Sequence, residues 1–304
     1  MVSQKVGGVF EASRVILGCM RLAGKGVIEG EKAVMTAFES GITMFDHADI
    51  YGGGESETVF GEILRRNPGL RQKIVLQDKV GICQGGYDAS KAHILEAAEG
   101  CLKRLGVEQI ETLLLHRPDA LMEPEEVAEA FETLHRDGKV KYFGVSNENL
   151  SQMTLLKKYM KQPLVIDQLQ FGPAHSILVD EGMNVNMHTP HAMQHGGDTL
   201  NWCRLNDITI QAWSPFQQGM IAGPFALDPR FAKLNEKLAE IAGRRGVTAD
   251  AVTAAWVLRH PAKIQLIAGS MSPERIKNIC AGADITLTHQ EWYDIYLSAG
   301  NPLP

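Results

Sequence analysis

The chain of 304 residues is 44% hydrophobic and 22% charged, and its formal net charge is -6. This composition is ordinary for a folded protein with a sizeable core. The acidic balance disfavours nucleic acids and anionic membranes as partners, because both require a basic surface. No apolar run reaches the roughly eighteen residues needed to span a bilayer, and the first twenty residues lack the pattern of a signal peptide.

Five cysteines are scattered along the chain without a C-x-x-C pair. They are Cys19, Cys83, Cys101, Cys203 and Cys280. An odd number at wide spacing is typical of reduced thiols rather than of a disulfide framework. We therefore expect free cysteines and a cytoplasmic location.

Eight short apolar runs recur along the chain, several of them rich in β-branched residues. Such runs are typical of strands that are buried on both faces, as in a parallel sheet. We predict strands over Val15–Leu17, Thr43–Asp46, Ile74–Lys79, Ile110–Leu115, Val140–Val145, Leu164–Leu169, Ile208–Trp213 and Ile264–Ala268.

Helical patterns lie between these runs, and most of them end at a glycine or before a proline. The predicted helices cover Glu31–Ser40, Ala89–Leu105, Pro124–Arg136, Asn149–Met160 and Arg230–Arg245, and a further helix starts at Ser272. The alternation predicts an α/β fold, a (β/α)8 TIM barrel with extra helices, as a single domain over residues 1–304. A doubly wound open sheet is the competing fold, but it usually carries a G-x-G-x-x-G turn, which this sequence lacks.

Four segments fall outside the plain alternation. Met1–Glu11 fits a small hairpin that closes the bottom of the barrel, and Thr248–His260 fits an extra helix. Thr288–Glu291 is a capping box that opens a C-terminal helix. Phe171–Asn201 is too long for an ordinary connection, so we expect a long rim loop, a place where functional lids often occur.

Four polar side chains lie at or just beyond the carboxyl ends of predicted strands: Asp46, Tyr51, Lys79 and His116. In a barrel of parallel strands these ends share one rim, where active sites lie. A nearby ammonium makes a tyrosine a better proton donor, and the aspartate would hold that lysine in place. The histidine would donate a hydrogen bond to a substrate oxygen. The set suits hydride addition to a carbonyl, which creates an alkoxide that needs a proton.

Seven stretches in the same order give the chain a resemblance to the aldo-keto reductases over nearly its whole length. They are Phe45–Gly52, Ile74–Lys79, Leu113–His116, Gly144–Asn147, Gln168, Trp213–Pro215 and Gly269–Ile276. The resemblance implies a (β/α)8 barrel that reduces aldehydes or ketones with NADPH and without a metal. It also implies that Tyr51 is the proton donor, supported by Asp46, Lys79 and His116.

The same resemblance implies where the cofactor binds. Ser146, Asn147 and Gln168 match positions that hydrogen-bond the nicotinamide carboxamide, and Trp213 matches the ring that stacks on the nicotinamide. The remaining matches are Gly18 and Met20 beside the ribose, Ser214, Phe216 and Gly219 along the pyrophosphate, and Ser270, Met271, Ser272 and Arg275 around the adenosine 2′-phosphate. Hydroxyls, a guanidinium and a helix N-terminus together favour an anion.

Four positions depart from the family's commonest pattern. Gly269, which belongs to the same cofactor loop, stands where many members have a phosphate-binding lysine. Asn278 and Ile279 stand where many have Glu-Asn, and Trp213 replaces a tyrosine. NADH therefore stays possible as a cofactor, although charge-assisted contacts of Arg275, worth about 1.5–3 kcal/mol, would favour NADPH.

The histidines His188, His191 and His195 form a cluster in the long connection, but their spacing matches no compact zinc pattern, and we expect no metal. The expected function is reduction of a small-molecule carbonyl substrate by a cytoplasmic NADPH-dependent oxidoreductase. A nucleotide-binding sensor or regulatory subunit with little turnover is the alternative. A barrel hydrolase that uses Asp46 and Asp49 is a third reading. No motif indicates an oligomeric state.

Overall fold

The computed structural model describes residues 3–193, 196–218 and 223–304. Eight parallel strands close into a barrel in the order β10-β11-β12-β3-β4-β5-β8-β9. They are β3 (Val15–Gly18), β4 (Met44–Asp46), β5 (Val75–Val80), β8 (Ile110–Leu115), β9 (Val140–Ser146), β10 (Leu164–Gln170), β11 (Thr209–Trp213) and β12 (Gln265–Ala268). No strand end differs from its predicted position by more than one residue, and the TIM barrel prediction is confirmed.

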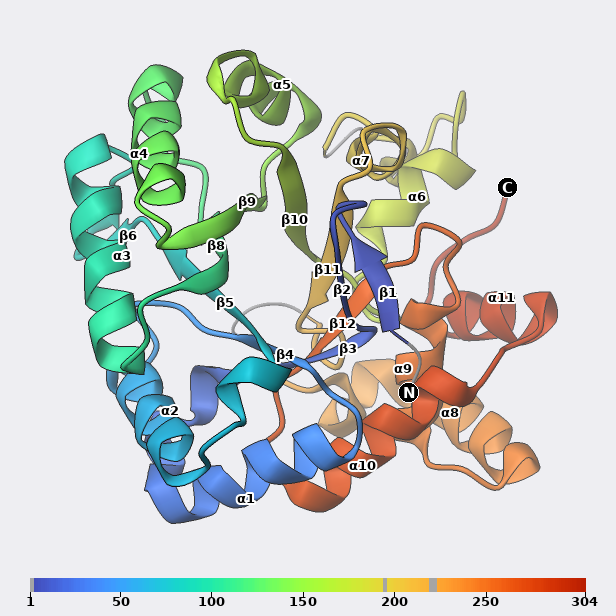
Figure 1. Cartoon of the computed structure of the whole chain (residues 1–304). Coiled ribbons are helices and arrows are strands. Elements are labelled where there is room, and N and C mark those ends of the chain that lie inside the picture. Colours follow the sequence, from blue (N-terminus) through green and yellow to red (C-terminus); the bar gives the residue numbers. More distant parts are fainter. Residues whose placement is uncertain (1–2, 194–195, 219–222) are drawn as a thin grey trace.

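A ring of helices surrounds the strands (Figure 1). Its members are α1 (Gly26–Glu39), α2 (Glu55–Arg66), α3 (Lys91–Leu105), α4 (Pro124–Arg136), α5 (Leu150–Tyr159), α7 (Thr199–Leu205), α9 (Ala249–Leu258) and α10 (Pro273–Ala281). Consecutive helices from α1 to α5 pack side by side, α5 contacts α7, and α9 and α10 complete the ring against α1.

Helix α2 is absent from the sequence-based prediction, because glycines interrupt its pattern. Gly54 precedes the helix with a φ of 91°, a conformation that favours glycine. Gly61 faces α3 so closely that a Cβ atom there would lie 2.6 Å from the carbonyl oxygen of Arg104. Gly54 therefore permits the turn before α2, and Gly61 permits the close packing against α3. Neither glycine ends a helix.

The helix predicted over Thr248–His260 is present as α9 (Ala249–Leu258), but α9 belongs to the ring, and the extra helix near the C-terminus is α8 (Ala232–Arg245). Helix α9 packs against β12, and its residues Ala251–Leu258 are all buried. Helix α8 lies outside α9 and against α11 (His289–Ser298). A helix that is apolar on every side is enclosed on every side, which makes α9 a member of the ring.

The N-terminal hairpin is confirmed. Strands β1 (Ser3–Val6) and β2 (Phe10–Ser13) pair antiparallel, and they lie in front of the barrel strands in Figure 1. Their apolar side chains join an interior cluster around Met44, and the ring of Phe10 stacks on Tyr142 at 5.1 Å. The hairpin therefore closes the end of the barrel opposite the carboxyl ends of the strands.

The connection after β10 is only partly a loop, which corrects the prediction for Phe171–Asn201. It contains α6 (Ile177–Met183), and α7 begins at Thr199. At its start a Cβ atom on Gly172 would lie 2.3 Å from the carbonyl oxygen of Pro215. A second small hairpin, β6 (Ile82–Cys83) with β7 (Gly86–Tyr87), follows β5 and was not expected.

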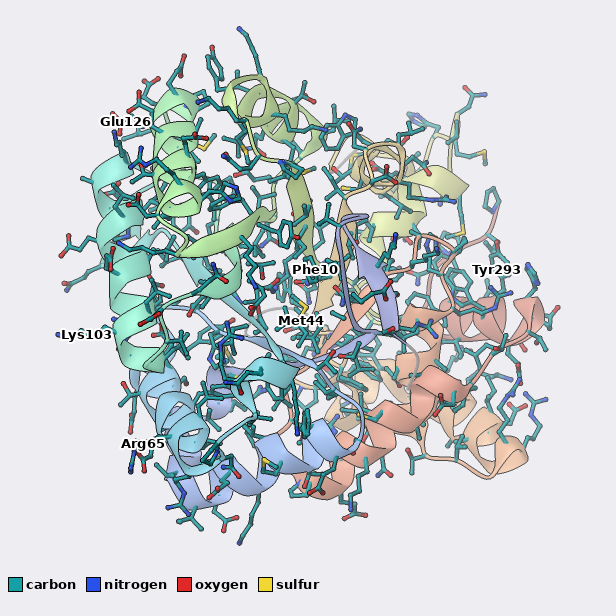
Figure 2. All side chains as sticks on the ribbon, in the orientation of Figure 1. Phe10, Met44, Arg65, Lys103, Glu126 and Tyr293 are labelled. Atoms are coloured by element: carbon teal, nitrogen blue, oxygen red, sulfur yellow. The ribbon has the colours of Figure 1, made fainter. Side chains whose placement is uncertain are left out.

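Polar and apolar side chains separate between the outside and the centre of the molecule. Arg65, Lys103 and Glu126 extend outward from the ring helices, whereas Met44 lies in the middle of the barrel (Figure 2). All five cysteines are free, as expected, and only Cys83 is half-buried rather than buried. Among the described helices none is both long and apolar enough to cross a membrane.

Candidate active site

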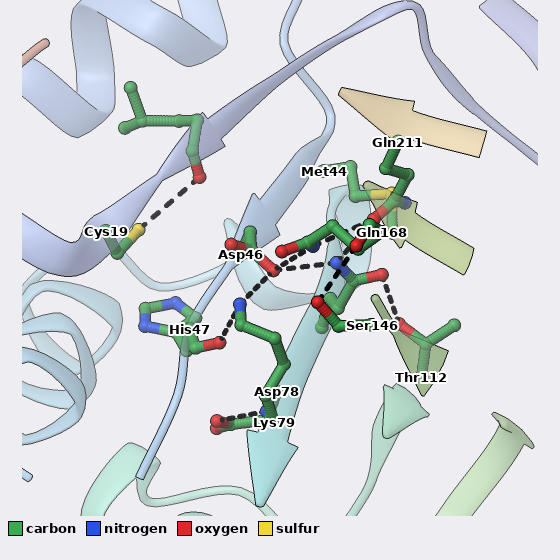
Figure 3. A network of polar contacts seen from close by, with 12 residues as sticks. Cys19, Met44, Asp46, His47, Asp78, Lys79, Thr112, Ser146, Gln168 and Gln211 are labelled. Carbon is green, nitrogen blue, oxygen red and sulfur yellow. Dashed lines mark hydrogen bonds and ion pairs between the residues drawn. The ribbon is translucent and has the colours of Figure 1, made fainter. Parts of the chain in front are cut away.

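A buried ion pair forms the base of the site. The Nζ atom of Lys79 donates to Oδ1 of Asp46 and to the backbone oxygen of His47, at 2.6 Å in each case (Figure 3). The lysine side chain is 0% exposed and the aspartate 2%. Burial opposes the charge of Lys79, but the carboxylate charge of Asp46 and its hydrogen bond outweigh burial and raise the pKa of the lysine. Lys79 therefore remains an ammonium group at physiological pH.

Tyr51 and His116 lie directly beside this pair. Tyr51 follows β4 in the turn that leads to α2, and its ring centroid lies 5.0 Å from Nζ of Lys79. The rings of Tyr51 and His116 meet edge to face, with centroids 5.9 Å apart and an angle of 84° between their planes. The structure thus places Asp46, Tyr51, Lys79 and His116 in one group.

The protonation of Tyr51 differs from the expectation. Burial raises the pKa of Tyr51 to about 12, although Lys79 acts in the opposite direction. The lysine stabilises the phenolate, as predicted, but burial costs the charged form more. Tyr51 is therefore a neutral phenol that holds a transferable proton.

His116 is neutral as well. Burial, together with the charges of Lys79 and Arg117, lowers the pKa of His116 to about 2. Its Nδ1 atom is buried and has no hydrogen-bond partner among the described residues. A neutral imidazole carries one N–H group, so His116 can donate one hydrogen bond to an oxygen without carrying a charge into the site.

A network of glutamines beneath the ion pair is the main feature that the sequence patterns did not reveal (Figure 3). Oδ1 of Asp46 accepts from Nε2 of Gln77 at 2.7 Å and of Gln168 at 3.1 Å. Both amides also donate to Oε1 of Gln211, and Nε2 of Gln211 in turn donates to Oε1 of Gln265. These residues interrupt otherwise apolar strands, and that interruption is the signal that could have identified them.

The four residues expected at the nicotinamide converge at the ends of β9, β10 and β11. Oγ of Ser146 donates to the backbone oxygen of Gln168 at 2.9 Å and accepts from Nδ2 of Asn147 at 2.8 Å. Nε1 of Trp213 donates to Oδ1 of Asn147 at 3.2 Å. The Nε2 atom of Gln168 donates to Asp46. A protein partner therefore already uses part of the amide that was expected to bind the nicotinamide.

The expected phosphate residues gather at the start of α10. The Ser272 side chain caps this helix, and Oγ of Ser270 accepts from the backbone of Ser272. Arg275 contacts both carboxylate oxygens of Asp250, at 3.0 and 3.1 Å, and lies over the ring of Phe216. The guanidinium is therefore held by an acid, which the expectation of an open phosphate ligand did not include.

The remaining expected cofactor positions lie nearby or fall outside the description. Met271 is buried, Met20 is 52% exposed, and Ser214 has a positive φ of 48°. A Cβ atom on Gly18 would lie 2.8 Å from Ile267, so this strand end has no room for a side chain. Gly219 lies outside the described residues.

Arg21 is a basic residue that the sequence analysis missed. Its Nη1 atom donates to the backbone oxygen of Gly269 at 2.8 Å. A Cβ atom on Gly269 would lie 3.0 Å from that nitrogen. The guanidinium of Arg21 therefore occupies space that a side chain at position 269 would need. Its position three residues after β3, in a stretch otherwise without charge, is the signal that could have found it.

Two further expectations concern a metal and a hydrolase. Among the described residues His188 and His191 belong to no group of three potential metal ligands, and His195 lies outside the described ranges. Burial and the charge of Glu57 raise the pKa of Asp49 to about 6. Asp46 is committed to Lys79, so these two aspartates do not form the pair that a hydrolase would use.

Comparisons with known proteins agree with this geometry. The model of the aldo/keto reductase family matches residues 14–296. Oxidoreductase YcsN of Bacillus subtilis, described as uncharacterized, is 36% identical over 297 residues, which are 93% of each chain. The 6-dehydroglucose reductase of Agrobacterium fabrum is 32% identical over 302 residues, which are 95% of each chain.

A solved structure gives the same answer for the fold. An aldo-keto reductase from Klebsiella pneumoniae in complex with NADPH superposes with a TM-score of 0.80 at 25% identity, over 99% of this chain and 97% of that one. The alternative of a sensor with little turnover is not favoured, because the relatives at 31–36% identity are named as oxidoreductases or reductases, whereas a putative potassium channel beta subunit of Schizosaccharomyces pombe is 28% identical. The chain belongs to the aldo/keto reductase family of oxidoreductases, as its resemblance implied.

Proposed function

We propose that this chain reduces an aldehyde or ketone to an alcohol with NADPH, and that Tyr51 donates the proton to the carbonyl oxygen. The observation that carries the proposal is that the Tyr51 ring lies next to both the Lys79 ammonium and the His116 ring. When bound, NADPH supplies a hydride to the carbonyl carbon. The phenol proton passes to the oxygen, and solvent later returns a proton to the phenolate.

Each neighbour of Tyr51 has a role that follows from its charge. The Lys79 ammonium stabilises the phenolate that forms as the proton leaves. Asp46 balances the lysine, and donors on Gln77 and Gln168 fix its carboxylate. Neutral His116 donates to the substrate oxygen, where preorganised donors are most effective in catalysis.

The residues that follow β12 and β3, which are the two strands before β4 in the barrel order, fit the phosphates of a dinucleotide. The first turn of α10 presents backbone N–H groups and the hydroxyls of Ser270 and Ser272, a combination that favours anions. Arg21 and Arg275 add positive charge on either side. We expect Arg21→Ala to weaken the binding of NADPH more than that of NADH, because Arg21 lies beside Gly269, where many family members have a phosphate-binding lysine.

The substrate is proposed to be a small-molecule carbonyl compound. The relative from Agrobacterium fabrum is named for 6-dehydroglucose, which makes this compound the first candidate to assay beside simple aldehydes and ketones. Residues 14–296 match one family model, the hairpin that precedes this range packs on the barrel strands, and α11 packs on α8. We propose that residues 1–304 act as one domain and that this domain works in the cytoplasm.

The assignment of Tyr51 is tested by Tyr51→Phe, with Tyr87→Phe as the control on an exposed ring. General acid catalysis contributes roughly 10²–10⁴-fold to a rate, so we expect a loss of that size in kcat for Tyr51→Phe and none for Tyr87→Phe. The dissociation constant for NADPH, measured by fluorescence, should stay within about twofold. Reduction of a good aldehyde at the wild-type rate by Tyr51→Phe would refute the assignment.

A further inference from the structure

A second cluster of chemically reactive side chains lies just beyond the end of β5. Cys83 on β6, Asp88 after β7 and His93 in the first turn of α3 each offer a ligand atom, and these atoms lie within 4.8 Å of one another. All three residues are half-buried, so the cluster is reachable from solvent. Nothing in carbonyl reduction uses it.

The geometry of the cysteine and the histidine matches two corners of a tetrahedral zinc site. Sγ of Cys83 lies 3.5 Å from Nε2 of His93. Zinc binds thiolate at about 2.3 Å and imidazole at about 2.0–2.1 Å, so the S···N edge of a tetrahedron is about 3.5–3.6 Å. In the structure this contact is a hydrogen bond between the thiol and the imidazole, and zinc would take the place of its proton at the same separation.

The third residue is held in place by the backbone. Oδ1 of Asp88 accepts a hydrogen bond from the backbone of Ser90 at 2.8 Å, and the backbone of Asp88 donates to Gly81 at 3.0 Å. Ser90 also caps α3 and accepts from the backbone of His93. Hydrogen bonds of this kind orient ligands around a metal, and here they fix two of the three candidate ligands relative to each other.

The surroundings are acidic. Asp49 and Asp119 lie close enough to Cys83 to act on its thiol together with Asp88. His93 also lines a cavity of about 610 Å³ whose wall includes Asp49 and Glu96, with Arg104 as its cation. A divalent cation would balance this excess of carboxylates, and the cavity provides an approach for it.

A second group with three potential ligands lacks these features. Glu57, Asp78 and Cys101 are likewise within 4.8 Å of one another, but all three are buried. Glu57 is already paired with Arg104 at 2.7 Å. A cation there would have to displace the arginine and cross the helix layer, so the half-buried cluster is the better candidate.

We propose that Cys83, Asp88 and His93 bind a zinc ion, with the fourth coordination position open toward the cavity lined by His93. Binding replaces the thiol proton of Cys83 by the metal and releases that proton to solvent, while Asp88 binds as the carboxylate and His93 through Nε2. The ion would join the β6–β7 hairpin to the first turn of α3, and so fasten the segment that follows Lys79.

The test uses the full-length protein, stripped of metal with a chelator and then titrated with zinc in a calorimeter. We expect one zinc per chain for the wild type and for His289→Gln, which changes an exposed histidine elsewhere. Cys83→Ser and His93→Gln should each weaken the binding by at least about tenfold, as lost ligands do. Failure of the wild type to bind one equivalent, or equal affinity in Cys83→Ser, would overturn the proposal.

Cobalt supplies a second measurement that does not depend on affinity. Cobalt in a thiolate site shows a charge-transfer band from sulfur, and we expect this band in the wild type and its absence in Cys83→Ser. Binding without the band would mean carboxylates alone hold the ion, which contradicts the proposal. Cys83→Ser should retain NADPH-dependent aldehyde reduction, so the metal site and the role of Tyr51 are tested separately.

Discussion

Lys79→Met removes the cation from the buried ion pair and leaves its partners in place. The substitution keeps a flexible apolar side chain of similar length, but Asp46 and the backbone oxygen of His47 lose donors at 2.6 Å. Removing one partner of a buried pair typically costs about 3–5 kcal/mol, because the other charge stays buried without compensation. The donors on Gln77 and Gln168 offset part of that cost.

The expected cost can be converted into a melting temperature. Unfolding entropy is about 2.1 cal/mol/K per residue, which for 304 residues gives roughly 0.6 kcal/mol/K. A loss of about 3–5 kcal/mol therefore lowers the melting temperature by roughly 5–8 °C. The assay is thermal unfolding followed by circular dichroism, with kcat for an aldehyde measured in parallel.

The matched control is Lys32→Met on α1. Lys32 pairs with Glu29 at 2.7 Å, nearly the same distance, but both side chains are 61% exposed. Because exposed pairs contribute little, we expect the melting temperature of Lys32→Met to equal that of the wild type. If Lys79→Met loses no more stability than this control, the argument that burial determines the strength of the pair is refuted.

Three further outcomes are expected. Arg275→Ala should raise the dissociation constant for NADPH by roughly tenfold or more, which is the equivalent of one charge-assisted hydrogen bond. The dissociation constant for NADH should change little. Equal losses of affinity for the two nucleotides in fluorescence titration would contradict the 2′-phosphate assignment. Burial holds the pKa of His47 at about 3, whereas the ordinary pKa of histidine is about 6.5. Below about pH 6.5 the unfolded state therefore binds a proton that the folded state does not, so the protein becomes less stable as the pH is lowered. His47→Phe should therefore gain roughly 2 kcal/mol relative to the wild type between pH 7 and pH 5 in urea unfolding, and a gap independent of pH would contradict the buried neutral imidazole. Gly172→Ala should lower the free energy of unfolding by about 1–3 kcal/mol, because the new Cβ would lie 2.3 Å from the carbonyl oxygen of Pro215. Gly182→Ala is the control, since a Cβ there meets open space. Equal melting temperatures for the two variants would show that the backbone at Gly172 moves to admit the methyl group without strain.

The barrel could be predicted from the sequence because its strands are buried on both faces. Ile110–Leu115 is apolar almost throughout, and the predicted and observed bounds agree. The helices were harder, since their boundaries and places depend on their neighbours. Glycines obscured α2, and the apolar surface of α9 indicated burial without indicating that β12 lies beneath it. Here the missing information was which surface each helix covers.

The sequence by itself determined the four side chains at the catalytic rim, because parallel strands bring their carboxyl ends together whatever the details of packing. The tertiary structure alone decided their charge states and partners. Tyr51 and His116 are neutral because burial outweighs nearby charges. Asp46 accepts a hydrogen bond from Gln168, a residue 122 positions away. Desolvation and pairing depend on groups that are distant in the chain, and only the closed barrel brings those groups into contact.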